Sequence, residues 1–435
     1  MQVDVLLGLQ WGDEGKGKIV DVFTPNYDVI ARFQGGPNAG HTLEFQGSKH
    51  VLHHIPSGIF RKDTINLIGN GVILDPMSFK EEIKGLEEKG IETKENLYLS
   101  NKAHLILPTH RLLDLALERQ KGKQKIGSTL KGIGPTYTDK VARIGLRIGD
   151  LTSKDFQNRY NQLKSIHLSL LHSYGINIEE ETLDQLAFED YEAKWLEAIG
   201  LISKMKLVDS ENFINQKINE GKKVLAEGAQ GTLLDIDFGS YPFVTSSNTI
   251  TAGVCAGLGI APSKINRVYG VFKAYCTRVG SGPFPTELND DCGQKLRDQG
   301  HEYGATTGRP RRCGWLDLPA LNYAIMLNGV TDLVMTKADV FTGFQKLNVC
   351  EQYVIENKKV DFSTFNLEQK NLECILHAFN GWSKNITHIS DYEQLPDDMK
   401  EYINFIEQKT NTQISVISTS ADRTGIIFKN DQMFN

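Results

Sequence analysis

Several features are scarce or missing in this 435-residue sequence, and each absence excludes a class of protein. The closest two of its six cysteines, Cys276 and Cys292, lie sixteen positions apart, which excludes a C-x-x-C metal knuckle or redox pair. No apolar run approaches the length of a membrane span and no basic leader precedes the first apolar run, so we expect a cytoplasmic protein with no membrane partner. The net charge of -6 gives no basic excess, so we expect no nucleic-acid partner.

The sequence also lacks internal repeats, low-complexity segments and Pro-, Gly- and Ser-rich linkers, which predicts one large domain over residues 1–435. Apolar runs of strand length recur instead, most of them broken by glycine, at 3–9, 27–34, 64–69, 222–228, 267–275, 331–339 and 413–420. Continuous rather than alternating apolar character is typical of strands that are covered on both faces.

Helical patterns lie between several of these runs. Over 75–90 an Asp-Pro pair resembles a helix cap, with Phe79, Ile83 and Leu86 on one face. Over 155–175 one stripe is expected to carry Phe156, Tyr160, Leu163 and Leu170. Strands that alternate with helices predict an α/β fold with a mostly parallel central sheet flanked by helices, with ligands beyond the carboxyl ends of the strands.

The first run leads into "QWGDEGKGKIVD", residues 10–21. From Gly12 to Lys18 this segment keeps the G-x-x-x-x-G-K spacing of a P-loop, but Ile19 stands where the motif has the serine or threonine that contacts magnesium. The segment is either a tight glycine-rich turn with surface lysines, or a phosphate-binding loop in which Asp13 has taken over the neighbourhood of the metal.

Three further segments carry side chains suited to nucleotides, although each also has an ordinary loop explanation. "GGPNAGHT" (35–42) presents an amide, an imidazole and a hydroxyl on a rigid turn. "GSTLKGIGPTYTDKVAR" (127–143) has glycines, hydroxyls and cations suited to a phosphate, or to a capped turn with a solvated basic face. "EGAQGTLLDIDFGSYPFVTSSNT" (227–249) is polar with few charges, as a base or sugar pocket would be.

Two later segments are more strongly charged. "GATTGRPRRCGWLD" (304–317) concentrates three arginines within four positions, and the Gly, Pro, Cys and Trp around them favour a built carboxylate or phosphate pocket over a nuclear-import patch. "VMTKAD" (334–339) follows a strand with a lysine and an aspartate that match the guanine-reading word of GTPases. A plain strand-end ion pair would look the same.

Taken together and in this order, the segments resemble the adenylosuccinate synthetase family. The resemblance lies in "QWGDEGKGK", "GGPNAGHT", "GSTLKGIGP", "EGAQG" with "YPFVTSSN", "KAYCTRVGSGPFPTE", "TTGRPRRCGWLD" and "TKAD", over residues 10–339, and in a late "STSADR". It implies a P-loop NTPase-like α/β enzyme that joins IMP and L-aspartate to adenylosuccinate, releasing GDP and phosphate from GTP through 6-phosphoryl-IMP. This reaction is the first committed step from IMP to AMP in purine nucleotide biosynthesis.

The resemblance also implies roles for particular residues. Asp13 would be the base that removes the N1 proton of IMP, and His41 would be the acid beside the transferring phosphoryl group. Asp13 and the Gly40 carbonyl would hold the cofactor, Mg²⁺. Arg143 would reach the IMP of the other subunit of a homodimer.

The substrate contacts that the resemblance implies fall into three sets. GTP would be bound by Gly12, Asp13, Glu14, Gly15, Lys16, Gly17, Lys18, Gly40, His41, Thr42, Arg311, Lys337, Ala338, Asp339, Ser418, Thr419 and Ser420. IMP would be bound by Asp13, Glu14, Gly15, Lys16, Asn38, Ala39, Gly40, His41, Thr129, Arg143, Gln230, Thr245 and Arg309. L-aspartate would be bound by Ala305, Thr306, Thr307, Gly308, Arg309, Pro310 and Arg311.

One departure and two rival readings remain. The family commonly has Gly-Pro where this chain has Ser420 and Ala421, and a β-carbon there would crowd the guanine base. A nucleotide-sensing GTP-binding protein without turnover would show damage to Asp13, His41 or the arginine cluster, and none is visible. A simple P-loop kinase or GTPase predicts a hydroxyl residue after Lys18 and gives no reason for "TTGRPRR".

Overall fold

The computed structural model describes residues 3–45, 47–122, 125–304, 308–367, 369–429 and 434. Its centre is a ten-stranded sheet in which every neighbouring pair is parallel except the last, where β22 runs antiparallel to β21. In spatial order the strands are β11 (Lys206–Val208), β7 (Leu97–Ser100), β5 (Ile65–Ile68), β2 (Val29–Arg32), β12 (Val224–Glu227), β1 (Val3–Gly8), β13 (Ile265–Lys273), β17 (Asp332–Thr336), β21 (Ile414–Ser418) and β22 (Ile426–Phe428).

The central strands are apolar because both of their faces are covered. All four residues of β2 and of β12 are buried, and β1 is buried at every position except Asp4, which is half-buried. Each of the seven apolar runs in the sequence forms a strand of this sheet, so the predicted α/β class with a mostly parallel sheet is confirmed. Within the described residues, no helix is both long and apolar enough to span a membrane.

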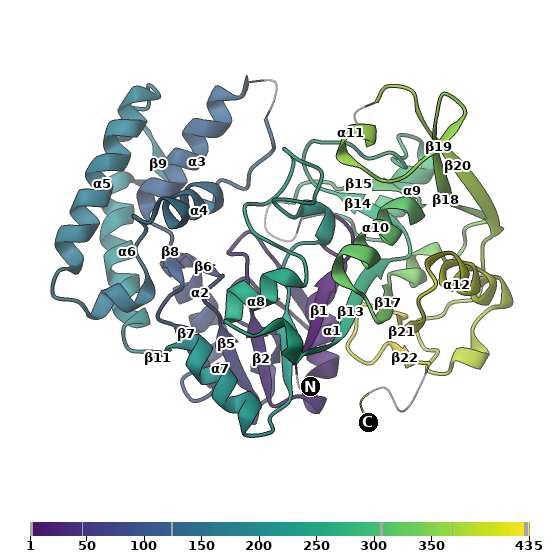
Figure 1. Ribbon diagram of the computed structural model, residues 1–435, viewed down its shortest axis with the longest axis horizontal. Helices are drawn as coiled ribbons and strands as arrows, with labels where there is room; N and C mark the ends of the chain where they lie inside the picture. The colour runs from purple at the N-terminus through teal and green to yellow at the C-terminus, as the bar shows by residue number, and fades with distance from the viewer. Residues whose placement is uncertain are drawn as a thin grey trace.

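Helices and small sheets surround the central sheet. Figure 1 shows α3 to α6 gathered at one end of the molecule and β18 to β20 with α12 at the other. The helices are α1 (Lys16–Phe23), α2 (Pro76–Glu87), α3 (Pro108–Gln120), α4 (Ile133–Ala142), α5 (Phe156–Ser173), α6 (Phe188–Ile202), α7 (Ser210–Asn219), α8 (Ala252–Leu258), α9 (Asp291–Gln299), α10 (Leu318–Asn328), α11 (Thr364–Leu367) and α12 (Asp397–Thr410). The smaller sheets are formed by β3 (His41–Phe45) with β4 (Ser48–Leu52), β6 (Ile73–Leu74) with β8 (His104–Leu105), β9 (Thr182–Leu183) with β10 (Leu186–Ala187), β14 (Cys276–Arg278) with β15 (Arg312–Gly314), and β16 (Leu316–Asp317), β18 (Lys346–Ile355), β19 (Lys358–Val360) and β20 (Leu372–Asn380) together.

The two helices that the sequence predicts are present, with one correction. Helix α2 begins after Asp75, whose side chain accepts the Met77 N–H, and it buries Phe79, Ile83 and Leu86 as expected. In α5, however, the expected apolar stripe is wrong at Leu170, which is 42% exposed. The buried stripe instead passes through His167, a polar residue that an apolar pattern cannot include.

Candidate active site

The segments with nucleotide-like chemistry meet at one edge of the central sheet. Parallel strands bring their carboxyl ends to the same edge, where ligands of open α/β sheets bind. The strands β1, β2, β12, β13, β17 and β21 end there at Gly8, Arg32, Glu227, Lys273, Thr336 and Ser418. The loops that follow these strands carry most of the polar segments, as predicted, whereas 127–143 and 304–317 follow helices α3 and α9.

The glycine-rich loop connects β1 to α1 through left-handed backbone. Gly12, Asp13 and Gly15 have φ angles of 89°, 59° and 86°, and Gly15 is the residue that precedes the first turn of α1. A positive φ is uncommon outside glycine, although aspartate adopts it more readily than most residues. This backbone leaves the Asp13 side chain 36% exposed at the loop surface.

The next residue, Glu14, faces inward and stabilises the loop. Its carboxylate accepts hydrogen bonds from the backbone N–H groups of Gln10 (3.1 Å) and Gly12 (2.9 Å) and from Nζ of Lys16 (2.6 Å). Glu14 is completely buried and Lys16 is nearly so. The two side chains therefore neutralise each other beneath the loop, and their predicted contacts to GTP and IMP stay predictions.

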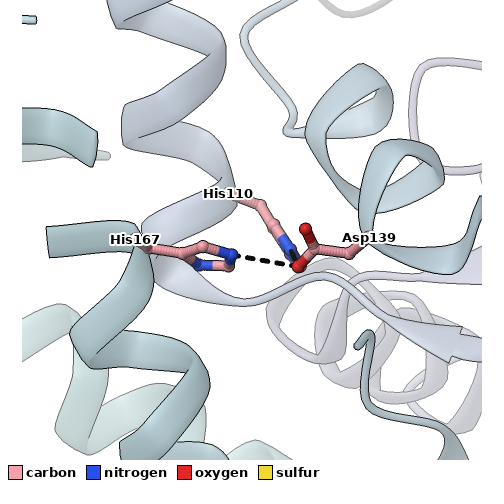
Figure 2. Close-up of side chains that lie close together, drawn as sticks. All are labelled: His110, Asp139 and His167. Carbon is pink, nitrogen blue, oxygen red and sulfur yellow. Dashed lines mark hydrogen bonds and ion pairs between the residues drawn. The ribbon is translucent and has the colours of Figure 1, made fainter. Parts of the chain in front are cut away.

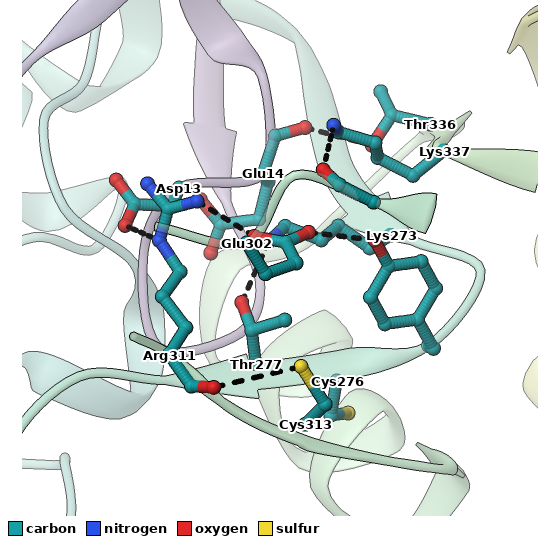
Figure 3. Close-up of polar contacts among 12 residues, drawn as sticks. Asp13, Glu14, Lys273, Cys276, Thr277, Glu302, Arg311, Cys313, Thr336 and Lys337 are labelled. Carbon is teal, nitrogen blue, oxygen red and sulfur yellow. Dashed lines mark hydrogen bonds and ion pairs between the residues drawn. The ribbon is translucent and has the colours of Figure 1, made fainter. Parts of the chain in front are cut away.

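Arg311 joins the glycine loop to the arginine-rich segment (Figure 3). Its Nε donates to Oδ2 of Asp13 at 2.7 Å, and its Nη1 donates to Oε2 of Glu302 at 2.6 Å. The structure thus brings together two residues that are 298 positions apart in the chain and that the sequence assigned to the same site.

Glu302 lies at the centre of a buried charge network that the sequence did not reveal. Besides Arg311 it accepts hydrogen bonds from Nζ of Lys273 (2.9 Å) and from the hydroxyl of Tyr275 (2.6 Å). Burial alone would raise the pKa of Glu302, but the positive charges of Lys273, Lys337 and Arg311 lower it to about 2. Lys273 lies inside the quoted "KAYCTRVGSGPFPTE", and Glu302 lies two residues before the arginine segment, but no spacing motif marked either residue.

His41, the first residue of β3, is held by the carboxylate at the end of β12. Its Nδ1 lies 2.5 Å from Oε1 of Glu227. The same oxygen accepts a hydrogen bond from the Ser57 hydroxyl (2.7 Å), and Oε2 accepts one from the Ser57 backbone N–H (2.8 Å). A carboxylate on Nδ1 fixes the tautomer and the orientation of the ring. Among the described residues nothing bonds to Nε2, which is buried, so this nitrogen is available to a bound group.

The surroundings of His41 favour its neutral form. Burial is the main cause that lowers its pKa, and the positive charge of Arg32 lowers it further, although Glu227 opposes both. A phosphoryl group close to Nε2 would add negative charge and raise the pKa again. Gly17 permits the close approach of α1 to this residue, because a Cβ at position 17 would lie 2.8 Å from the His41 Cβ.

Lys18 binds the late segment that the sequence assigned to guanine. Its Nζ donates to the Ser418 hydroxyl and to the carbonyl oxygens of Ser420 and Gly425, each at 2.8 Å. Burial lowers the pKa of Lys18 to about 8. Its side chain thus fastens this segment to α1, and a contact with phosphate remains a prediction.

The other guanine residues lie beside this segment. Lys337 has a left-handed backbone (φ 62°) and donates from Nζ to the Gly300 carbonyl at 2.9 Å. Asp339 is half-buried, and burial raises its pKa. The Ser420 hydroxyl fills the space beside Gly425, because a Cβ on Gly425 would lie only 2.0 Å from it.

The predicted IMP residues are brought together in part. The Gln230 amide donates to the Asn38 side-chain oxygen at 3.1 Å, and the Gln230 Oε1 is buried with no partner among the described residues. Thr245 is half-buried, whereas Thr129 and Arg309 are exposed. Of the predicted aspartate segment, Gly308 to Arg311 is described, and Ala305, Thr306 and Thr307 lie outside the described residues.

A second polar cluster lies among α3, α4 and α5 (Figure 2). Nε2 of His110 and Nε2 of His167 approach the same Oδ2 of Asp139, at 2.8 and 2.9 Å, and the three side chains have the spacing of a metal site. The Leu107 N–H, however, donates to Nδ1 of His110 at 2.9 Å, so the proton of the neutral ring must be on Nε2. That nitrogen donates to Asp139 and has no lone pair for a metal. The hydrogen bonds of the cluster therefore serve to connect three helices.

Acidification is expected to destabilise the protein through His110. Burial is the main cause that lowers the pKa of His110 to about 4; the charge of His167 also lowers it and Asp139 raises it. An unfolded histidine titrates near about 6.5, so between these two values the unfolded chain binds a proton that the folded chain does not. Stability therefore falls as the pH falls through this window, by about 2 kcal/mol at pH 5 from His110 alone. Urea denaturation near pH 7.5 and pH 5 would measure it.

The matched variant is His110→Asn, in which the amide oxygen can still accept the Leu107 N–H. Because asparagine does not titrate, the difference in unfolding free energy between the two pH values should shrink by about 2 kcal/mol. A variant with the pH dependence of the wild type would contradict this assignment.

The site consists of a strand, a glycine loop and the helix that starts at that loop. Beside them lie an arginine and a histidine that is oriented by a carboxylate. This arrangement defines an α/β enzyme that acts on nucleotides. Comparison with known proteins narrows this class. The family model described as adenylosuccinate synthetase matches residues 5–427, so the chain belongs to the adenylosuccinate synthetase family.

Individual relatives agree. Adenylosuccinate synthetase from Flavobacterium johnsoniae is 56% identical over 429 residues, 99% of this chain and 100% of that protein. The protein of the same name from Christiangramia forsetii is 54% identical and covers 97% of this chain and 99% of its own length. The solved structure of fully ligated adenylosuccinate synthetase from Plasmodium falciparum is 39% identical with a TM-score of 0.92, covering 99% of this chain and 100% of that one. The chain is a GTP-dependent ligase of IMP and L-aspartate in purine biosynthesis.

Proposed function

We propose that the ligation runs in two steps through 6-phosphoryl-IMP, with Asp13 as the base and His41 as the acid. In the first step O6 of IMP bonds to the γ-phosphorus of GTP, the bond to the bridging oxygen breaks, and GDP leaves. In the second step the amino nitrogen of L-aspartate bonds to C6, the C6–O6 bond breaks, and phosphate leaves with O6 as the amine loses a proton. Phosphorylation thus turns a poor leaving group into a good one.

The accessible carboxylate of Asp13, held in a glycine loop by a left-handed backbone, is the observation that carries the proposal. Removal of the N1 proton of IMP by this carboxylate would place negative charge on O6 and make it a nucleophile. Arg311 pairs with one carboxylate oxygen, Oδ2, and thereby fixes the direction of the other.

His41 would act at the phosphoryl group through the nitrogen that has no partner among the described residues. With Nδ1 bound to Glu227, Nε2 is the atom that can donate to a γ-phosphoryl oxygen once the ring is protonated. The charge that develops on the phosphoryl oxygens is where such a donor contributes most to phosphoryl transfer.

The residues at the loop suit Mg²⁺, which prefers oxygen ligands. The Asp13 carboxylate and the Gly40 carbonyl would hold the ion, and Asp13 is partly exposed while Gly40 is half-buried. When bound, Mg²⁺ neutralises charge on the β- and γ-phosphates of GTP.

For the substrates we retain the three sets of contacts that the family resemblance implies. The adjacency of Asn38 and Gln230 supports a shared IMP subsite, and the position of Arg311 supports its role towards GTP and L-aspartate. Lys337 and Asp339 at the end of β17, with Ser418 to Ser420 at the end of β21, support a guanine subsite between two neighbouring strands.

We further propose a homodimer in which Arg143 reaches the partner's IMP, in the cytoplasm. Arg143 is exposed and caps the end of α4 in a left-handed conformation, with Val141 79% and Ile144 41% exposed beside it. Exposed apolar side chains beside a functional cation suit a subunit interface. All six cysteines are free, which agrees with a reducing compartment.

Mixing two inactive variants tests the dimer. Arg143→Leu and Asp13→Asn should each be nearly inactive, but in an equal mixture half of the dimers are hybrids with one intact site. The mixture should therefore recover about a quarter of the wild-type specific activity after subunit exchange. No recovery, together with a monomer mass in analytical ultracentrifugation, would refute the shared site.

A drop-out assay tests turnover itself. Purified protein is incubated with magnesium, GTP, IMP and L-aspartate, each substrate is omitted in turn, and the nucleotides are separated by chromatography. We expect adenylosuccinate and GDP only in the complete mixture. GDP released without IMP and L-aspartate would indicate a plain GTPase, and no product at all would favour a nucleotide-sensing protein.

A further inference from the structure

We propose that Glu302 is a positioning residue that fixes Arg311 for L-aspartate and the transferring phosphoryl group. Resting on the proposed roles of Arg311, this inference adds a residue outside every motif that the sequence offered. The geometry behind it is a chain of alternating charges, from Lys273 through Glu302 and Arg311 to Asp13 (Figure 3).

The link between Glu302 and Arg311 is double. The side-chain bond from Nη1 to Oε2 is 2.6 Å, and the Arg311 backbone N–H donates to the Glu302 carbonyl at 2.8 Å. An arginine side chain has many rotamers, and a buried charged acceptor restricts them at the guanidinium itself. Since Nη1 is bound to Glu302, the Nε–H of the same group points to Asp13.

Glu302 is itself held rigidly. Both Glu302 and Lys273 are completely buried, and Tyr275 donates a third hydrogen bond to the Glu302 carboxylate. Lys273 is the last residue of β13, so its ammonium is anchored to the central sheet. Through Glu302 and Lys273, the guanidinium of Arg311 is therefore held in a fixed position relative to the central sheet.

The same turn also contacts the guanine side of the site. The carbonyl of Gly300, two residues before Glu302, accepts the hydrogen bond from Nζ of Lys337. The turn 300–302 therefore holds one side chain from each of two predicted subsites, for guanine and for L-aspartate. This placement is why we expect the effect of Glu302 to appear in kinetics and not only in stability.

The primary test is the kinetics of Glu302→Gln, which keeps the shape but removes the charge. We expect kcat to fall about tenfold or more and the KM for L-aspartate to rise about tenfold, because a misplaced guanidinium loses contacts that depend on ångström-scale geometry. The KM for IMP, whose predicted contacts lie mainly on other loops, should change less than about twofold.

The matched control is Glu287→Gln. Glu287 accepts hydrogen bonds from Nε and Nη2 of Arg312, the residue next to Arg311. That pair is partly exposed, and neither residue belongs to a predicted ligand set. Its kcat and both KM values should stay within about threefold of the wild type. Equal effects from the two variants would mean that any lost ion pair disturbs the loop, and would overturn the proposal.

Glu302→Gln leaves Lys273 buried without a counter-ion, which lowers the folding stability and can by itself reduce the measured activity. The double variant Lys273→Met with Glu302→Gln removes that buried charge. If it recovers thermal stability but keeps the raised KM for L-aspartate, and its crystal structure shows Arg311 displaced from Asp13, positioning is supported. Kinetics that recover together with stability would overturn it.

The conservative variant Glu302→Asp tests rescue, because it retains the charge on a shorter side chain. Its kcat and its KM for L-aspartate should be closer to the wild-type values than those of Glu302→Gln. Failure of this proposal is separable from failure of the proposed base. Asp13→Asn tests the base directly, whereas the Glu302 variants report on L-aspartate through the KM.

Discussion

Replacing Asp13 by asparagine is expected to lower kcat for adenylosuccinate formation by about 10³-fold, in the middle of the range for loss of a general base. Asparagine is nearly the same size but cannot accept the N1 proton of IMP, so O6 stays a weak nucleophile. Steady-state assays of GDP and adenylosuccinate measure the loss. Because the substitution keeps the loop's shape, binding of GTP should survive.

The control is GTP binding by calorimetry, with an expected change of less than about tenfold in Kd. A Kd that changes so little would show that the base is lost while the loop is intact. The shape of the loop depends on Glu14 and the glycines more than on Asp13. Turnover of Asp13→Asn within about tenfold of the wild type would refute Asp13 as the base.

Replacing His41 by asparagine should lower kcat by about 10²- to 10³-fold with little change in KM for IMP. The asparagine amide can occupy the place of Nδ1 and still donate to Glu227, so the buried carboxylate keeps a partner. What disappears is Nε2, the buried atom that we expect to reach the phosphoryl group. Pre-steady-state measurement of GDP release would locate the defect in the phosphoryl-transfer step.

Ser57→Ala is the matched control for this second prediction. It removes one hydrogen bond to Glu227, at 2.7 Å, but leaves the second from the Ser57 backbone and the contact with His41. We expect kcat to fall less than about tenfold. If Ser57→Ala and His41→Asn were equally impaired, the histidine would be structural rather than catalytic.

Much of the fold follows from local sequence. Both faces of the central strands are buried, so their apolar character is continuous and each of the seven runs could be recognised. The strands β7, β11 and β22 lie toward the two ends of the sheet, and β11 and β22 are short and less buried. The apolar signal of β11 and β22 is correspondingly weak, and the sequence did not predict them. Strand β7 was also not predicted, although it is as long as β5 and mostly buried.

The site could be predicted where the chemistry is carried by contiguous residues. The spacing of the glycine residues indicated a tight loop directly after the first strand, and the structure has this loop between β1 and α1, with left-handed backbone at Gly12 and Gly15. Partners that are distant in sequence could not be predicted in the same way. The pairing of His41 with Glu227 spans 186 positions, and that of Lys273 with Glu302 joins a strand to a loop. Such pairs depend on tertiary packing, which local patterns do not encode.

Leu170 and Lys18 show two other limits. An apolar stripe predicts burial by residue type, so it failed in α5, where His167 is buried because Asp139 and Thr109 satisfy its nitrogens. A motif assigns a role by its position, so it placed Lys18 in the GTP set but did not reveal that the Lys18 ammonium also binds three oxygens of the late segment. The contact with GTP stays a prediction.

The most direct test of the account is the fate of the IMP oxygen. IMP labelled with ¹⁸O at O6 is converted with GTP and L-aspartate, and the released phosphate is analysed by mass spectrometry. If O6 is phosphorylated before L-aspartate displaces it, each phosphate carries one ¹⁸O atom. Unlabelled phosphate, with the ¹⁸O released to water, would contradict the proposed intermediate and with it the roles of Asp13 and His41.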